Sequence, residues 1–232
     1  MALVKFGGGI IEMRGAIAGT VFSRNSSGNY ARAKTTPINP QSPLQTAVRS
    51  VMAALTTRWS QVVTAAQRAA WDLYASNVSV LNRLGESVNI SGFNHYIRSN
   101  ANLLRIGETP VDAGPVVFEI PEADPIFAIT ASEATQEITA TFDATAAWAL
   151  EDGAWLYLFQ GAPQNPQINF FDGPWRLLTS IAGVPSTGAV SPDVSDAVFA
   201  IAELQREWVY ARIQRADGRL SEKFRADTFC AA

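Results

Sequence analysis

The side chains most often used in catalysis are scarce in this sequence. Histidine and cysteine each occur once in 232 residues, as His95 and Cys230. A zinc site of a usual type, a cysteine–histidine dyad or a serine–histidine–acid triad would each have to include His95. A lone imidazole on a helix is more often a structural hydrogen-bonding group, and no base nearer than Arg225 is available in sequence to activate Cys230. We therefore expect no catalytic residue, no metal site and no cofactor.

Several pairs of acidic residues carry carboxylates that could serve in a glycosidase or as calcium ligands. They fall at predicted turns and strand ends and lack the spacing of an EF-hand loop. We interpret them as solvated loop charges, and a hydrolase of host-surface sugars stays an alternative. The pairs are Glu151–Asp152, Asp193–Asp196 and Glu203–Glu207.

A second chemistry-bearing set, cationic and aromatic, lies near the N-terminus. Residues 1–41 are rich in glycine and show no helical period, so they cannot bury themselves and are expected to form an extended arm. Cations and aromatics along an extended chain suit either nucleic acid or a protein surface. Glu12 interrupts a modest charge density, which favours protein, although the arm could also fold back on its own helices. The predicted docking residues are Arg14, Phe22, Arg24, Asn25, Tyr30, Arg32 and Lys34.

Charge divides the chain into two halves. Residues 1–106 carry eleven Lys or Arg against three acids, and residues 107–232 carry seven against eighteen, within a net charge of −3. The sign changes at a Gly- and Pro-containing stretch, 107–115, that is typical of a linker. We therefore predict an arm over 1–41, a helical module over 42–109 and an acidic domain over 110–232.

Local patterns assign elements to the basic half. Alternating stretches at 19–23 and 28–33 flank a polar turn and predict a small β-ribbon. Ser42 and Pro43 begin a predicted helix that runs to about residue 60, Thr64 with Gln67 caps a second, and Ser91 caps a third over 92–106. The first helix places one apolar stripe on one face, formed by Leu44, Val48, Val51, Met52, Leu55 and Trp59.

The acidic half changes to the two-residue period of strands. Seven aromatic and β-branched stretches, separated by turn residues, predict an antiparallel β-sandwich, and Val209, Ala211 and Ile213 are expected to face its core. The fold class is α+β. At the level of fold this half resembles immunoglobulin-like or fibronectin-like sandwiches without their disulfide. The predicted strands span 126–131, 136–143, 154–160, 175–181, 196–202, 207–215 and 222–229.

Compartment signals point to the cytoplasm. Glycines and charges interrupt every apolar stretch before the roughly 18 residues of a membrane helix, and the N-terminus lacks the pattern of a signal peptide. One cysteine allows no intramolecular disulfide. We expect a soluble protein made in a reducing cytoplasm, with no membrane partner.

The basic half also resembles a recurring module of proteins encoded by tailed bacteriophages and prophage-like regions, over roughly residues 10–106. That resemblance implies a virion structural setting and transfers no catalytic residue. Immunoglobulin-like domains are common on phage heads and tails, which agrees with the acidic half. The residues that carry the resemblance are 19–25 (GTVFSRN), 28–32 (GNYAR), 36–40 (TPINP), Gln45, Trp59, 66–71 (AQRAAW) and 91–94 (SGFN).

The resulting expectation is a non-enzymatic head decoration, or cement, protein. The basic module would dock on the major capsid protein or other virion subunits and bridge capsomers, while the acidic domain projects outward. A homo-oligomer on the particle, assembled in the bacterial host cytoplasm, is expected, and nucleic acid is the less favoured partner. The alternatives are a tail, baseplate or head-to-tail connector component, and a nucleic-acid-binding protein.

Overall fold

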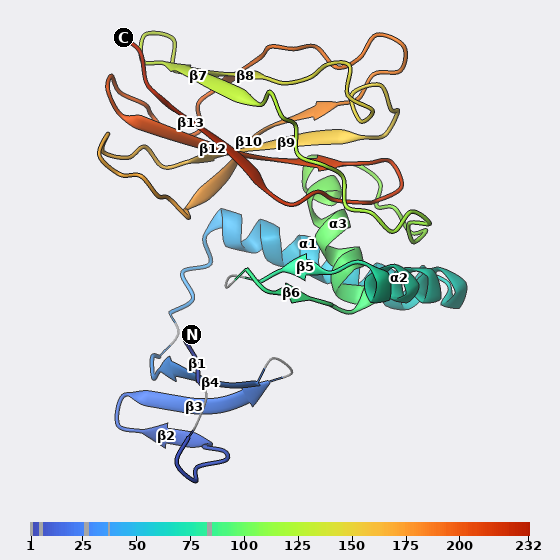
Figure 1. Cartoon of the computed structure of the whole chain (residues 1–232), viewed down its shortest axis with the longest axis vertical. Coiled ribbons are helices and arrows are strands. Elements are labelled where there is room, and N and C mark those ends of the chain that lie inside the picture. The colour runs from blue at the N-terminus through green and yellow to red at the C-terminus, as the bar shows by residue number, and fades with distance from the viewer. Residues whose placement is uncertain (1, 5–6, 26–27, 37, 83–84) are drawn as a thin grey trace. The chain divides into compact units, whose positions relative to one another are not determined.

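The computed structural model describes residues 2–4, 7–25, 28–36, 38–82 and 85–232 (Figure 1). The chain forms two compact units, an N-terminal unit (Met1–Pro43) and a C-terminal unit (Leu44–Ala232). The first division therefore falls two residues from the predicted end of the arm. Among the described helices, none combines the length and apolar character needed to cross a lipid bilayer.

The N-terminal unit is a four-stranded antiparallel sheet in the order β1 (Ala2–Leu3), β4 (Gly28–Ala33), β3 (Thr20–Asn25), β2 (Gly15–Ile17). The predicted ribbon is confirmed, since β3 and β4 pair from Thr20 opposite Ala33 to Asn25 opposite Gly28. Its turn residues 26–27, like Pro37 of the module, lie outside the described residues. The expectation of an extended arm was wrong, because β1 and β2 pair with the ribbon on its two edges.

The three predicted helices are present as α1 (Pro43–Gln61), α2 (Ala65–Asn77) and α3 (Gly92–Ile106), with a short hairpin of β5 (Val80–Leu81) and β6 (Ser87–Val88) between α2 and α3. The Thr64–Gln67 capping box begins α2, and the Ser91 hydroxyl accepts from the Asn94 amide at the start of α3. Gly107, at a φ of 90°, ends α3 in the left-handed conformation that favours glycine.

An aromatic cluster holds the helices together. Its buried members are Leu55, Val63, Trp71, Tyr74, Val78 and Tyr96. Trp71 makes edge-to-face contacts with Tyr74 and Tyr96, at centroid distances of 6.0 and 5.7 Å. Of the predicted stripe of α1, Val51, Leu55 and Trp59 meet this cluster, whereas Leu44, Val48 and Met52 stay exposed.

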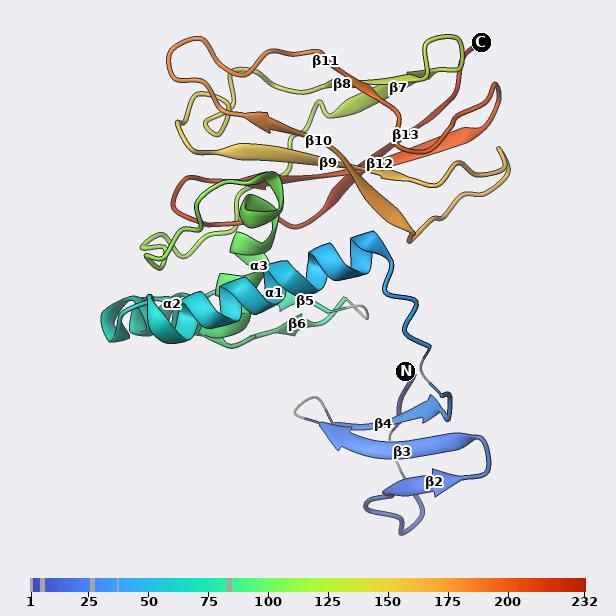
Figure 2. The same ribbon diagram turned by 180° about the vertical axis from the view of Figure 1, so that it is seen from behind.

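The rest of the C-terminal unit is β-rich and contains two antiparallel sheets (Figures 1 and 2). One has the order β10 (Trp175–Ala182), β9 (Trp155–Gly161), β12 (Arg206–Gln214), β13 (Phe224–Phe229). The other has the order β11 (Asp193–Asp196), β8 (Glu137–Thr141), β7 (Ala128–Ser132). Both sheets contribute to one apolar cluster, and Val209, Ala211 and Ile213 lie in it as predicted. The chain is thus a mixed α+β protein with mostly β structure.

Six of the predicted strands coincide with observed ones, and the stretch 196–202 does not. Its strand, β11, lies earlier, at Asp193–Asp196. After β11 a side chain replaces the neighbouring strand as hydrogen-bond partner. The Gln160 side-chain oxygen accepts from the backbone amides of Val198 and Phe199 at 2.6 and 3.0 Å. A segment whose polar backbone groups are satisfied in this way does not require a neighbouring strand.

The predicted linker at 107–115 was also wrong. Asp112 accepts two hydrogen bonds of 2.8 Å from the Arg58 guanidinium, and its carbonyl accepts one from the Trp71 indole at 3.0 Å. Arg98 of α3 forms an ion pair with Glu222 at 2.8 Å. These contacts join the 107–115 segment to the helices and α3 to the chain before β13. The helices and both sheets belong to one compact unit, without a division near residue 110.

Candidate functional site

The predicted docking residues lie on or beside the sheet of the N-terminal unit. Phe22, Arg24 and Asn25 belong to β3, and Tyr30 and Arg32 belong to β4. Lys34 directly follows β4, where its amide donates to the Gly19 carbonyl at 2.8 Å. Arg14 directly precedes β2 and forms an ion pair of 2.5 Å with Glu12, which reduces its charge toward a partner.

The sheet register divides these residues between its two faces. Residues that are directly opposite each other in antiparallel strands share a face, and neighbours along a strand alternate. Tyr30 lies opposite Ser23 and Arg32 opposite Val21, so both share a face with Asn25. Phe22 and Arg24 lie on the other face. The predicted set is therefore brought onto one sheet but not onto one surface.

This sheet lacks an interior of its own. Among residues 4, 7–25, 28–36 and 38–43, none is buried. Phe22 and Tyr30 are half-buried, and Arg24 and Arg32 are exposed at the ends of their strands. A sheet usually buries one face against another layer. Among the described residues of the N-terminal unit, neither face of the sheet therefore forms a buried core.

The lone histidine has a structural place. His95 is 1% exposed, and its ring packs edge-on against Tyr74 at a centroid distance of 5.1 Å. Burial, with the nearby charge of Arg98, lowers the pKa of His95, so the ring is neutral at neutral pH. Its Nε2 has no hydrogen-bond partner among the described residues. A buried imidazole inside the helical cluster cannot reach a substrate.

The lone cysteine is buried as well. Cys230 lies in the apolar cluster to which both sheets contribute. Burial and the carboxylates of Glu207, Glu133 and Glu203 raise the pKa of its thiol. The thiolate form is therefore disfavoured, which agrees with the expected inert cysteine.

The acidic pairs lie in different environments. Glu151 forms an ion pair with Arg215, and Asp193 accepts from the Ser195 hydroxyl at 2.9 Å. Glu207 contradicts the interpretation as a loop charge, because it is fully buried in β12. The alternation that places Val209, Ala211 and Ile213 in the core also points Glu207 inward, and this signal could have identified it. Within the described ranges, no group of three His, Cys, Asp or Glu residues could hold a metal ion.

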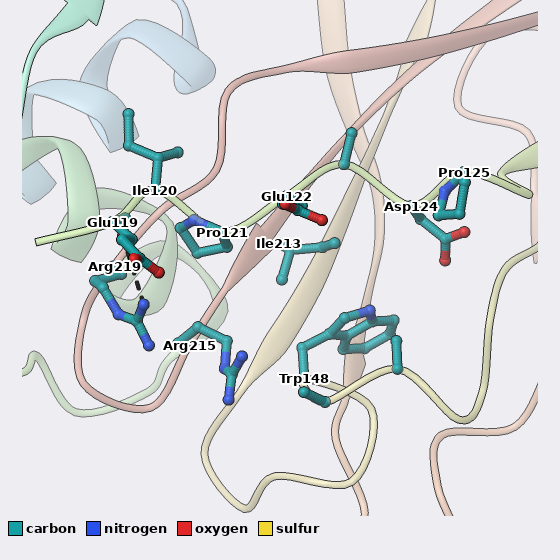
Figure 3. A pocket seen from close by; sticks show the side chains of 13 residues that line it. Glu119, Ile120, Pro121, Glu122, Asp124, Pro125, Trp148, Ile213, Arg215 and Arg219 are labelled. Atoms are coloured by element: carbon teal, nitrogen blue, oxygen red, sulfur yellow. Dashed lines mark hydrogen bonds between the residues drawn. The ribbon is translucent and has the colours of Figure 1, made fainter. Parts of the chain in front are cut away.

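A pocket of about 350 Å³ opens beside β12, where the 119–125 segment meets Trp148 and the β12–β13 hairpin (Figure 3). Both of its cations already have partners. Arg219 pairs with Asp217 at 2.7 Å and donates to the Glu119 carbonyl at 3.4 Å, while Arg215 pairs with Glu151. Trp148 is 3% exposed and packs on Phe142 at 5.5 Å. The pocket thus combines two ion-paired arginines and an indole of the core with the acids Glu119, Glu122 and Asp124. The Asp124 carboxylate accepts from the Ile126 and Asp143 amides.

Comparison with known proteins gives little. No protein-family model and no curated protein matches the chain. Among solved structures, one similar chain is that of a family 76 glycoside hydrolase from a bovine Bacteroides thetaiotaomicron strain, at 14% identity and a TM-score of 0.33. The similarity covers 47% of this chain and 21% of that one, so the aligned part spans about a fifth of the hydrolase. A likeness this distant carries no argument about activity.

Proposed function

We propose that this chain is a non-enzymatic structural protein of a tailed-phage virion, a head decoration protein that docks through its N-terminal unit. The resemblance of residues 10–106 to a phage module supports the setting. The virion is then its location, and the major capsid protein or another virion subunit is its partner.

The observation that carries the proposal is a cationic sheet without an interior. The described part of the N-terminal unit contains four cationic residues and one acid, Glu12. The cationic residues are Arg14, Arg24, Arg32 and Lys34. None of the residues whose burial is described there is buried, whereas the C-terminal unit contains its own apolar clusters. Three or more strands usually need one covered hydrophobic face for stability. An acidic protein surface would supply both the cover and the opposite charge.

The C-terminal unit is proposed to be the projecting part, with its β-rich half an immunoglobulin-like sandwich. Two antiparallel sheets of four and three strands share one apolar cluster, which supports that architecture. The unit carries thirteen Lys or Arg against twenty acids. Such a surface is repelled by packaged DNA and by other acidic surfaces, which favours an outward orientation.

Incorporation into particles tests the proposal. The full chain and a chain lacking residues 1–41 are supplied to cells in which the encoding phage lacks its own copy, and the purified particles are assayed by mass spectrometry and imaged. We expect the full chain on the head and a loss of at least about tenfold on deletion, since each 1.4 kcal/mol of docking energy changes occupancy by that factor. Undiminished incorporation of the shortened chain would contradict docking through this unit.

Point variants identify the docking face. Tyr30→Ala with Arg32→Ala alters one face of the sheet, and Phe22→Ala with Arg24→Ala alters the other. Lys223→Ala, which removes an exposed cation of the C-terminal unit, is the control and should leave incorporation unchanged. Density on the tail alone would favour the tail or connector alternative. Retention of the full chain on DNA, with a steep dependence on salt, would favour nucleic acid.

A further inference from the structure

An apolar groove runs between the first half of α1 and the end of α3. It has a volume of about 210 Å³. Leu44, Val48 and Met52 follow one another at four-residue steps along α1, and they are 45%, 53% and 41% exposed. Each therefore leaves about half of its side chain uncovered, in a row on one helix face. The groove is lined by Leu44, Val48, Val51 and Met52 with Ala101 and Arg105.

Two cationic side chains belong to the helices that form this groove. Arg105 lines it from α3, and Arg49 follows Val48 on α1. Across the described ranges, neither guanidinium forms an ion pair with a carboxylate. An occupant of this groove therefore needs apolar side chains next to acidic ones.

Another segment of the same chain has that chemistry. Residues 116–119 (VVFE), here called the tongue, are all exposed, with Val116 at 83%. The tongue is held at both ends, because Pro115 is buried and Ile120 packs on the helical cluster. The carboxylates of Glu119 and Glu122 have no ion-pair partner in the described part of the chain. The tongue thus exposes three apolar side chains, followed by carboxylates without ion-pair partners, on a segment that is held at both ends.

The tongue does not occupy the groove of its own chain, since none of its residues is among those that line the groove. Asp112, four residues before Val116, is held at 2.8 Å by Arg58 near the end of α1. The groove extends along α1 from Leu44 to Met52, which precede Arg58 by about 21 and 9 Å of helix. Figures 1 and 2 agree that the outermost part of the loop between α3 and β7 lies away from the beginning of α1.

We propose that the groove of one copy binds the tongue of a second copy. Val116, Val117 and Phe118 would cover the apolar face of α1, and Glu119 and Glu122 would approach Arg49 and Arg105. Because groove and tongue are different surfaces, the contact is head-to-tail, and every added copy offers another free groove and tongue. Such a contact forms rings or chains of this protein. It does not depend on the docking proposal, because it is made by the C-terminal unit alone.

Sedimentation velocity on the full chain tests this contact without any particle. We expect association that grows with concentration up to about 1 mM, the range of a weak interface. Val48→Glu in the groove and Phe118→Glu in the tongue should each weaken it by at least about tenfold, or 1.4 kcal/mol. The matched controls are Leu73→Glu on α2 and Val190→Glu in a loop, which are 55% and 79% exposed outside both surfaces.

A mixture of the two variants gives the decisive result. The Val48→Glu chain keeps its tongue and the Phe118→Glu chain keeps its groove, so together they should form a dimer that neither forms alone, and growth should stop there. Raised salt should weaken the dimer, because the paired charges are screened. A monomeric full chain at about 1 mM, association unchanged by Val48→Glu, or a mixture without dimer would each overturn the proposal.

Discussion

Glu207 is an acid in an apolar interior. It is 0% exposed in β12, on the face that carries Val209 and Ala211 into the apolar cluster shared by both sheets. The Gln160 amide nitrogen lies 3.5 Å from one carboxylate oxygen, and the other oxygen has no partner among the described residues. Burial raises the pKa of Glu207 to about 7. A carboxyl that is protonated near neutral pH avoids most of the cost of a buried charge.

This pKa makes stability depend on pH. From pH 4.5, where the unfolded carboxyl titrates, to about 7, the folded chain binds the proton that the unfolded chain releases. Stability therefore falls as the pH rises through that window, and the loss is complete above it. Glu207→Gln keeps the shape without the charge, so we expect it to stabilise the chain by up to about 3 kcal/mol at pH 8 and little at pH 4.

Urea unfolding across pH 4 to 8 measures this effect. Glu137→Gln, at a half-buried position on β8, is the matched control and should not flatten the pH profile. An equal change in stability from Glu207→Gln at both ends of the range would show that the charge of Glu207 is not responsible.

At the scale of elements, the carboxylate of Asp112 fixes the position of the segment after α3 on the helices. Asp112 accepts from Arg58 twice and from the Tyr96 hydroxyl at 3.2 Å. Burial and this carboxylate raise the pKa of Tyr96, and the carboxylate raises that of Arg58. These groups thus hold 107–115 on the helices, although its glycines and prolines are typical of a free linker.

Removal of this carboxylate should loosen the segment. We expect Asp112→Ala to lower the free energy of unfolding by about 2 to 3 kcal/mol, because it leaves a half-buried guanidinium and a buried phenol without their acceptor. Chemical denaturation measures the change, and hydrogen exchange should show faster exchange at 107–115. Asp152→Ala, at an exposed turn position, is the control. An Asp112→Ala chain as stable as this control would contradict the role of Asp112.

At the scale of the molecule, the division after Pro43 predicts a proteolysis pattern. Lys34 is exposed and directly follows the last strand of the N-terminal unit, and the next trypsin site along the chain, Arg49, lies inside α1. Limited trypsin treatment should therefore yield a resistant fragment from Thr35 to the C-terminus, since exposed backbone is cut first. Mass spectrometry identifies the fragment. Early cleavage at Arg105 or Arg219 instead would contradict a single compact C-terminal unit.

The sequence by itself determined the elements that depend on near neighbours. The Thr64–Gln67 capping box, the Ser91 cap and the β3–β4 hairpin involve residues a few positions apart, so their patterns predict them directly. The same holds for the inward set of β12, which follows from a period of two. The same local patterns located most of the predicted docking residues on β3 and β4. Their division between two faces depends on which residue of β3 lies opposite which of β4.

Only the tertiary structure decided which surfaces are covered. The stripe of α1 looks uniform in sequence, yet Leu55 is buried and Val48 is exposed, because the aromatic cluster contacts Val51, Leu55 and Trp59 and leaves Val48 uncovered. Asp112 holds a segment that reads as a linker, and Arg98 reaches Glu222 across 124 positions of sequence. Whether a residue is buried depends on contacts with residues distant in sequence, and local spacing carries no information about those contacts.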